Sequence, residues 1–349
     1  MKEIFREDIW KDDEYNYEAA YGFMPNLHFY IHEEDGSDGQ KERPFMLVVP
    51  GGGYCMVVPP EGEIVAKVFY EQGMNCAVLT YTTDITMCVP LRKQPMNDAS
   101  RAVRYIRKNA ARLHADPNKL VICGFSAGAH VCGSLGVHYE DVKDPDPELD
   151  SVSNRPDAMI LSYPVITSGE FTHIYSMWAL VGQDGPKEDY DYFSLEKHVT
   201  EKTPPTFLWQ TVTDNLVPVE NSALFAENCR AAKVPYAYYA FPSGWHGLSV
   251  CNEAWRKGDF GEPYTMEQVD RAVAAVREGR GVRVPDARQK ELMEQFPEPP
   301  KPLDPDNTDG SSDQAQQEAP AAPAWPEMPE YDDVVLWPKM AKAWMERIW

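Results

Sequence analysis

Residues 120–128 read Leu-Val-Ile-Cys-Gly-Phe-Ser-Ala-Gly, and this stretch decides the fold. The apolar residues 120–123 predict a short buried strand, and the small apolar residues 129–137 predict a helix. A Gly-x-Ser-x-Gly pattern between a strand and a helix is typical of a sharp turn that presents the serine hydroxyl above a sheet. Gly124 and Gly128 permit so tight a turn. Ser126 is therefore the candidate nucleophile.

The five-residue pattern is weak evidence by itself, because three fixed residues recur by chance in roughly one chain in ten of this length. Its surroundings favour the functional interpretation over an ordinary glycine-rich turn. Further strands are expected at residues 27–31, 45–49, 76–80, 158–161, 207–212 and 236–241, with helices at 64–71, 98–114 and 219–232. Apolar strands that alternate with amphipathic helices indicate a mostly parallel sheet covered on both faces. The predicted fold class is α/β.

A serine hydroxyl needs a positioned base before it can attack a carbonyl carbon. In strand–turn–helix serine sites the chain order is serine, acid, histidine. His246 follows the expected strand 236–241 and has Gly244 and Gly247 around it, whereas the other seven histidines lie earlier in the chain. Asp214 directly follows the expected strand 207–212, and its alternative interpretation is a turn aspartate. We therefore expect Asp214 and His246 to complete the site.

A glycine loop, Pro50-Gly51-Gly52-Gly53-Tyr54, directly follows the expected strand 45–49. Backbone N–H groups of such a loop can donate to the oxyanion that develops during acyl transfer. We expect the N–H groups of Gly52, Gly53 and Ala127 to be those donors. A phosphate cradle is the alternative, but the Gly-x4-Gly-Lys-Ser/Thr spacing is absent.

The composition narrows the possible partners. The chain has 33 basic and 55 acidic residues and a net charge of −22, which disfavours nucleic acids and anionic membrane surfaces. No apolar run approaches the roughly 18 residues of a membrane span, and residues 1–10 do not resemble a signal peptide. The seven cysteines form no Cys-x-x-Cys pair, which favours free thiols in the cytoplasm over disulfides or a zinc site. No metal or cofactor is expected.

The character of the chain changes after about residue 260. Helices are expected at residues 266–278 and 288–296, and nine prolines within residues 297–329 predict an acidic linker. A last helix would place apolar side chains on one face, namely Trp337, Met340, Ala341, Trp344 and Ile348. We expect this helix to pack on the main domain, the alternative being a helix that binds a partner or a second copy. The predicted division is a catalytic domain of residues 1–260 and 331–349, with an insertion at 261–330.

Together these motifs resemble the α/β-hydrolase-fold esterases related to the hormone-sensitive-lipase group, and most of all the bacterial acetyl esterases often linked to acetylated xylan. The resemblance covers about residues 45–250. It is carried by the glycine loop with Glu61-Gly62-Glu63, by residues 116–130, 155–167 and 195–205, and by the segments around Asp214 and His246. It implies that Ser126, Asp214 and His246 are a catalytic triad and that Gly52, Gly53 and Ala127 form the oxyanion hole. Pro50 stands where the wider group has histidine.

The resemblance implies a serine carboxylesterase that removes short acyl groups, above all acetyl, from oligosaccharides through an acyl-enzyme. Residues 167–202 form only a short cap, which favours a small acyl group. Tyr54 and Trp245 are the candidates to stack on a sugar ring, or else are core residues. The expected partner is a small-molecule ester, an acylated saccharide, with the oligomeric state left open. The alternatives are a serine peptidase of the prolyl-oligopeptidase type and a non-catalytic binding protein of the same fold.

Overall fold

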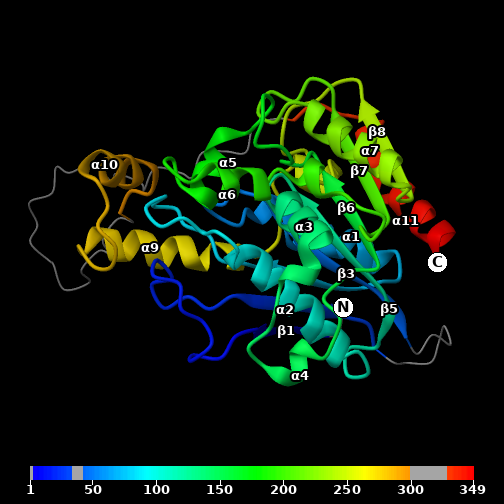
Figure 1. Ribbon diagram of the computed structural model, residues 1–349, viewed down its shortest axis with the longest axis horizontal. Helices are drawn as coiled ribbons and strands as arrows, with labels where there is room; N and C mark the ends of the chain where they lie inside the picture. Colours follow the sequence, from blue (N-terminus) through cyan, green and yellow to red (C-terminus); the bar gives the residue numbers. More distant parts are fainter. Residues whose placement is uncertain (1–2, 34–41, 299–327) are drawn as a thin grey trace, which may run out of the picture.

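The computed structural model describes residues 3–33, 42–298 and 328–349, and within them eight strands form one sheet in the order β1-β2-β4-β3-β5-β6-β7-β8 (Figure 1). Strands β1 and β2 are antiparallel to their neighbours, and β3 to β8 run parallel to one another. The strands are β1 (Glu3–Asp8), β2 (Asn26–Ile31), β3 (Arg43–Val49), β4 (Asn75–Thr80), β5 (Ala115–Phe125), β6 (Ala158–Ser162), β7 (Thr206–Thr211) and β8 (Tyr236–Phe241). The predicted α/β class with a mostly parallel sheet is confirmed.

Helices cover both faces of this sheet, because side chains of the buried strands alternate between two apolar layers. In β3, Leu47 joins the layer under α2, α3 and α7, and Val48 joins the layer under α1 and α11. The helices are α1 (Glu63–Glu71), α2 (Gln94–Lys108), α3 (Ala127–His138), α4 (Pro147–Asp150), α5 (Ile174–Val181), α6 (Lys187–Tyr192), α7 (Glu220–Ala232), α8 (Glu253–Arg256), α9 (Glu267–Arg277), α10 (Asp286–Gln295) and α11 (Trp337–Ile348). Short 3-10 helices include η1 (Pro59–Glu61), η3 (Leu195–His198) and η4 (Tyr264–Met266).

The last helix, α11, packs on the sheet with its aromatic face. Trp337 is fully buried, and its ring stacks on that of Trp209 in β7 with 5.3 Å between centroids. The ring of Trp344 packs against that of Phe207 in the same strand, with 5.8 Å between centroids. The indole N–H of Trp337 also donates to the carbonyl oxygen of Ser249, at 2.8 Å. The expected packing of this helix on the main sheet is therefore observed.

Helices α9 and α10 form a pair beside the main body (Figure 1). The apolar face of α9, including Val269 and Val273, packs with Leu292 of α10 and with Ile85 of the loop after β4. Gln268 accepts a hydrogen bond from the backbone N–H of Thr83, at 2.9 Å. These contacts attach the described part of segment 261–330 to the main body. Most of the expected proline-rich linker lies outside the described residues.

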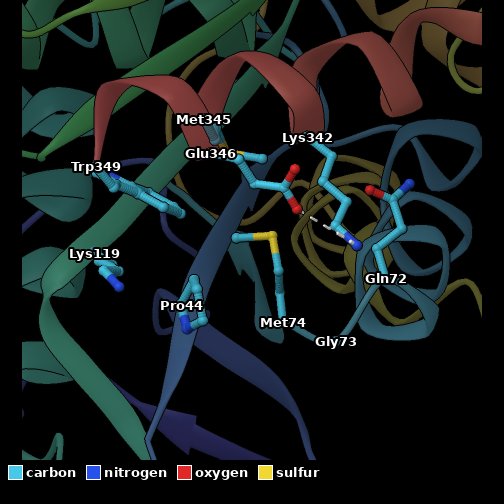
Figure 2. Close-up of a pocket in the computed structure, with 9 residues that line it drawn as sticks. All are labelled: Pro44, Gln72, Gly73, Met74, Lys119, Lys342, Met345, Glu346 and Trp349. Carbon is cyan, nitrogen blue, oxygen red and sulfur yellow. Dashed lines mark ion pairs between the residues drawn. The ribbon is translucent and has the colours of Figure 1, made fainter.

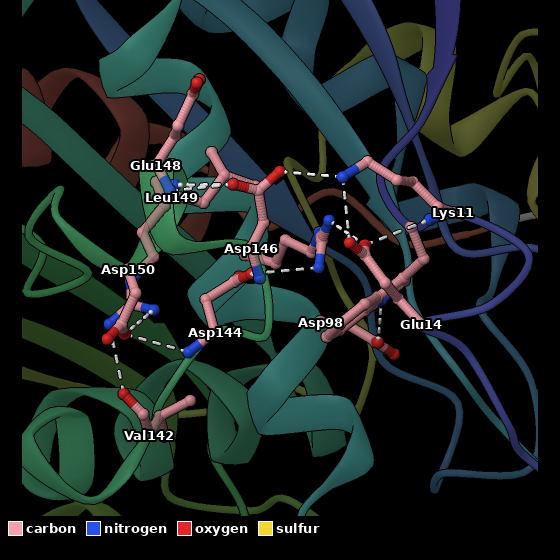
Figure 3. A network of polar contacts seen from close by, with 12 residues as sticks. Lys11, Glu14, Asp98, Val142, Asp144, Asp146, Glu148, Leu149 and Asp150 are labelled. Carbon is pink, nitrogen blue, oxygen red and sulfur yellow. Dashed lines mark hydrogen bonds and ion pairs between the residues drawn. The ribbon is translucent and has the colours of Figure 1, made fainter.

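An ionic network fastens the segment after β1 to the face that carries α2 (Figure 3). Lys11 bridges Glu14 and Asp146, with both distances 3.0 Å. Arg101 of α2 lies between Glu14 and Asp144, and its guanidinium is 3.0 Å from the Asp144 carboxylate. The Arg101 side chain is only 3% exposed, so this pairing is part of the interior.

Candidate active site

Ser126 lies at the junction of β5 and α3 in a strained backbone conformation, with φ 53° and ψ −120°. The two glycines of the motif are required by close packing of the backbone. A Cβ on Gly128 would lie 2.1 Å from the carbonyl oxygen of Val49, and one on Gly124 would lie 2.4 Å from the carbonyl oxygen of Gly128. Only glycine therefore fits on either side of this serine, and the turn presents the Ser126 side chain at the carboxyl end of the sheet.

In the structure the three polar side chains predicted from the sequence are hydrogen-bonded in series. His246 Nε2 lies 2.8 Å from Ser126 Oγ, and His246 Nδ1 lies 2.8 Å from Asp214 Oδ2. A neutral imidazole that carries its proton on Nδ1 donates to Asp214 and accepts from the serine hydroxyl. This is the arrangement that a general base needs.

Asp214 is fixed by more than its histidine partner. Its side chain is fully buried, and its Oδ1 accepts from the backbone N–H groups of Leu216 and Val217, each at 2.9 Å. Burial alone would raise the pKa of Asp214, but the hydrogen bond and charge of His246, with these two N–H groups, outweigh it and lower the pKa. The carboxylate therefore stays ionised, and it can stabilise an imidazolium.

The loop that carries His246 is tied to the end of β7. The hydroxyl groups of Thr211 and Thr213 donate to the carbonyl oxygen of Gly244, at 3.0 and 2.8 Å. Gly244 has φ 145°, which an L side chain rarely adopts. These contacts fix the position at which the imidazole leaves the loop.

The glycine loop after β3 lies beside the serine. Gly52 and Gly53 have φ of 125° and 62°, and both line the same cavity as Ser126. Within the described part of the chain, the N–H groups of Gly52, Gly53 and Ala127 have no hydrogen-bond acceptor. Three unpaired donors beside a serine hydroxyl suit a developing oxyanion.

The cavity at Ser126 has a volume of about 380 Å³. Its walls are Gly52, Gly53, Val58, Pro60, Glu61, Ser126, His173, Leu216, His246 and Gly247. His173 is the residue directly before α5, and its Nδ1 lies 2.8 Å from the hydroxyl oxygen of Ser176. Burial, with the nearby His246, lowers the pKa of His173, so its ring is neutral at neutral pH.

The expectation that Tyr54 stacks on a sugar is wrong. The Tyr54 side chain is 1% exposed, and its hydroxyl lies 2.7 Å from Nδ1 of His130, which is itself fully buried. The turn at Tyr54, with φ 66°, directs the ring into the core. Trp245 is 37% exposed and contacts Tyr331, so its suggested role remains a prediction.

A second cavity, of about 390 Å³, lies at the opposite edge of the sheet, near the amino ends of β3 and β4. Figure 2 shows Lys342 and Glu346 of α11 paired at this cavity, with Trp349 and Lys119 nearby. Lys119 Nζ lies 5.8 Å from the Trp349 ring centroid. The two cavities are similar in size, and the one that contains Ser126 is the candidate active site.

Three polar residues of the site region were not assigned a role from the sequence. They are Glu61, Tyr163 and His173. Glu61 belongs to a motif that carried the family resemblance, but the sequence alone gives no partner for its carboxylate.

Among the described residues no helix has both the length and the apolar character to cross a membrane. All seven cysteines are free thiols.

The fold and the Ser126–His246–Asp214 arrangement define the chain as an α/β-hydrolase. The chain belongs to the BD-FAE family, whose sequence model matches residues 31–229, more than half of its length.

Three relatives illustrate this membership. The protein named endo-1,4-beta-xylanase B of Butyrivibrio fibrisolvens is 57% identical over 272 residues, which cover 78% of this chain and 42% of that protein. The acetylxylan esterase of Xylanibacter ruminicola is 29% identical over 209 residues, which cover 57% of this chain and 40% of that protein. The crystal structure of an acetyl ester-xyloside bifunctional hydrolase from Caldicellulosiruptor lactoaceticus has a TM-score of 0.66 and 34% identity, covering 76% of this chain and 96% of that one.

The chain therefore spans less than half the length of the first two relatives and nearly all of the third. The second and third are named as ester hydrolases.

Proposed function

We propose that the chain is a serine carboxylesterase that removes acetyl or similarly short acyl groups from saccharides. The observation that carries this proposal is the hydrogen-bonded series Ser126–His246–Asp214 at a cavity beside three backbone N–H groups that have no acceptor in the described part of the chain. The names of two relatives support an ester of a saccharide as the substrate class.

In the proposed reaction, Ser126 Oγ attacks the ester carbonyl carbon while His246 Nε2 takes the serine proton. The N–H groups of Gly52, Gly53 and Ala127 hold the oxyanion, and Asp214 stabilises the imidazolium. The bond between the acyl carbon and the sugar oxygen breaks, and His246 gives its proton to that departing oxygen. Water then attacks the acyl-enzyme and loses a proton to His246, which returns it to Ser126 Oγ. The products are the carboxylic acid and the free sugar hydroxyl.

The cavity favours a small acyl group. It must hold both the acyl chain and the reacting part of the sugar within about 380 Å³. Between residues 167 and 202 the described helices are the short elements α5, α6 and η3. The neutral ring of His173 is a polar group on the cavity wall that can hydrogen-bond a sugar hydroxyl.

Cleavage of the glycosidic bond itself is not proposed, although one relative carries a xylanase name. Glycoside hydrolysis commonly uses two carboxyl groups that flank the scissile bond, roughly 5–9.5 Å apart. Glu61 is the carboxylate among the cavity-lining residues, and both of its oxygens already accept hydrogen bonds from Gly51 and Tyr163. Among the residues that the structure describes, the cavity therefore has no second carboxylate on its wall, and the one that it has is already hydrogen-bonded.

We further infer that residues 1–260 and 331–349 form the catalytic unit, with α9 and α10 of the insertion attached to it. The free thiols favour action in a reducing compartment such as the cytoplasm.

The test compares the parent protein with Ser126→Ala, and uses Ser151→Ala, a serine whose hydroxyl bonds the carbonyl oxygen of Glu148 away from the site, as the control. Hydrolysis of p-nitrophenyl acetate and acetate release from acetylated xylo-oligosaccharides are measured. We expect Ser126→Ala to lose at least about 1,000-fold in kcat at unchanged melting temperature, and the control to retain parental activity. Near-parental turnover by Ser126→Ala would contradict the proposal.

Two further measurements separate the alternatives. A fluorophosphonate probe should label the parent at Ser126, whereas a non-catalytic binding protein would not react. A serine peptidase would cleave prolyl peptides faster than esters. Faster cleavage of p-nitrophenyl octanoate than of the acetate would contradict the short-acyl assignment.

A further inference from the structure

Glu61 is a buried carboxylate at the end of η1, ten residues after Gly51, and only 4% of its surface is exposed. Its Oε2 accepts from the backbone N–H of Gly51, and its Oε1 accepts from the hydroxyl of Tyr163, both at 2.7 Å. Gly51 has no side chain because a Cβ there would lie 2.9 Å from this carboxylate and 2.8 Å from the Cβ of Ser126. The carboxylate is therefore packed between the glycine loop and the nucleophile.

The direction of each hydrogen bond is fixed by chemistry. The Tyr163 hydroxyl oxygen accepts from the backbone N–H of Ser249, at 3.0 Å, so its own proton points to Glu61. Burial holds the pKa of Tyr163 above its ordinary value, so the phenol keeps that proton. Glu61 thus receives two donors, and only a group that accepts at both oxygens satisfies them.

These bonds join the three segments that carry the site. Gly51 precedes the oxyanion donors Gly52 and Gly53, and Ser249 follows His246 by three residues. Tyr163 follows Ser162, whose carbonyl oxygen accepts from the backbone N–H of Ser126 at 3.0 Å. The Tyr163 ring also meets the His246 ring edge-on, with 4.9 Å between centroids.

We propose that Glu61 is a positioning residue that, through Gly51 and Tyr163, fixes the oxyanion loop relative to Ser126 and His246. The inference rests on the proposed esterase function, because it concerns the geometry in which that reaction occurs. Small displacements of the reacting groups lower the rate of the chemical step more than they weaken substrate binding.

The test uses Glu61→Gln, which has nearly the same shape but only one accepting oxygen. Either Gly51 or Tyr163 then faces an NH2 group. We expect kcat to fall about 10- to 100-fold with KM changed less than about threefold, because a small misplacement of the reacting groups can cost about 100-fold in rate. Tyr163→Phe, which unties Ser249 and leaves Gly51 bound, should change kcat in the same direction. Tyr30→Phe is the control, because it removes a buried hydroxyl that bonds Tyr264 instead.

A boronic acid provides a readout that a purely structural role would not move, since its adduct with a serine oxygen places a negative oxygen in the oxyanion hole. For Glu61→Gln the inhibition constant of phenylboronic acid should rise in parallel with the loss of kcat, and Tyr30→Phe should leave it unchanged. Parental kcat and parental boronate inhibition in both Glu61→Gln and Tyr163→Phe would overturn the inference while leaving the esterase assignment intact. A parent protein that neither hydrolyses esters nor reacts with fluorophosphonate would instead remove the function on which the inference rests.

Discussion

The Nδ1 atom of His246 lies 2.8 Å from Oδ2 of Asp214, and the Asp214 side chain is fully excluded from solvent. This contact determines which ring nitrogen of His246 carries the proton. Asn at position 214 would place either an NH2 group or a neutral carbonyl oxygen, which is a weaker acceptor, against Nδ1 of His246. We predict that Asp214→Asn lowers kcat for p-nitrophenyl acetate by about 10⁴-fold with little change in melting temperature. Asp191→Asn, which removes an exposed carboxylate paired with Lys197, serves as the control. A loss smaller than tenfold would contradict the role given to Asp214.

The pH dependence of the rate should distinguish the two buried carboxylates. The pKa of Asp214 is lowered, so this group stays charged as the pH falls. Burial raises the pKa of Glu61, against the hydrogen bonds from Tyr163 and Gly51, so Glu61 takes up a proton at a higher pH than an ordinary glutamate. A protonated Glu61 can no longer accept from both donors, and activity is lost as the pH falls through the raised pKa.

We therefore predict that log kcat/KM of the parent falls more steeply at acid pH than that of Glu61→Gln, because only the parent has a carboxylate at this position. The measurement is a pH–rate profile of both proteins with one p-nitrophenyl ester. Superimposable acid limbs would exclude Glu61 as a group whose protonation lowers the rate.

His173 should contribute to kcat/KM through the sugar part of the substrate and not through the acyl group. Its Nδ1 is bonded to Ser176, and Nε2 has no partner among the described residues, so this nitrogen is free for a substrate hydroxyl. We predict that His173→Leu lowers kcat/KM about tenfold for acetylated xylo-oligosaccharides and less than twofold for p-nitrophenyl acetate, which has no sugar hydroxyl. His198→Leu is the control, because His198 bonds the backbone of Asp191 and does not line the cavity. Equal losses on both substrates would contradict this assignment.

The network around Arg101 should contribute to stability. Removing this guanidinium leaves the Asp144 carboxylate, 2% exposed, without its cation. We predict that Arg101→Met lowers the free energy of unfolding by about 3–5 kcal/mol, because a buried charge then lacks its partner. Arg112→Met breaks an exposed pair with Glu7 and should cost less than about 1 kcal/mol. Urea unfolding of the two variants measures the difference, and equal losses would show that Arg101 is not a buried partner.

Much of the fold could be predicted from the sequence, because the central strands contain apolar runs, such as residues 45–49 of β3 and 120–123 of β5. The strand β1 could not, since Glu3–Asp8 is rich in charged residues at the edge of the sheet. There Phe5 stacks on Phe29 of β2, with 4.8 Å between ring centroids, and this contact depends on the partner strand.

The three polar residues of the proposed triad were predictable because each lies on the segment that follows a strand, Ser126 after β5, Asp214 after β7 and His246 after β8. The Glu61–Tyr163 contact was not, because the two residues are 102 positions apart and meet only in the folded chain. Tyr54 was misassigned because its neighbourhood in sequence, the glycine loop, does not show that the backbone reverses at this residue and buries the ring.

The bond between Trp337 and Ser249 has a consequence for the order of events during synthesis. The two residues are 88 positions apart, so Ser126, Asp214 and His246 all leave the ribosome well before the helix that ties down the loop after His246. A nascent chain that has not yet produced α11 carries every side chain of the site without that tie. The direction of translation thus delays the Trp337–Ser249 bond until all three side chains of the proposed triad have been synthesised.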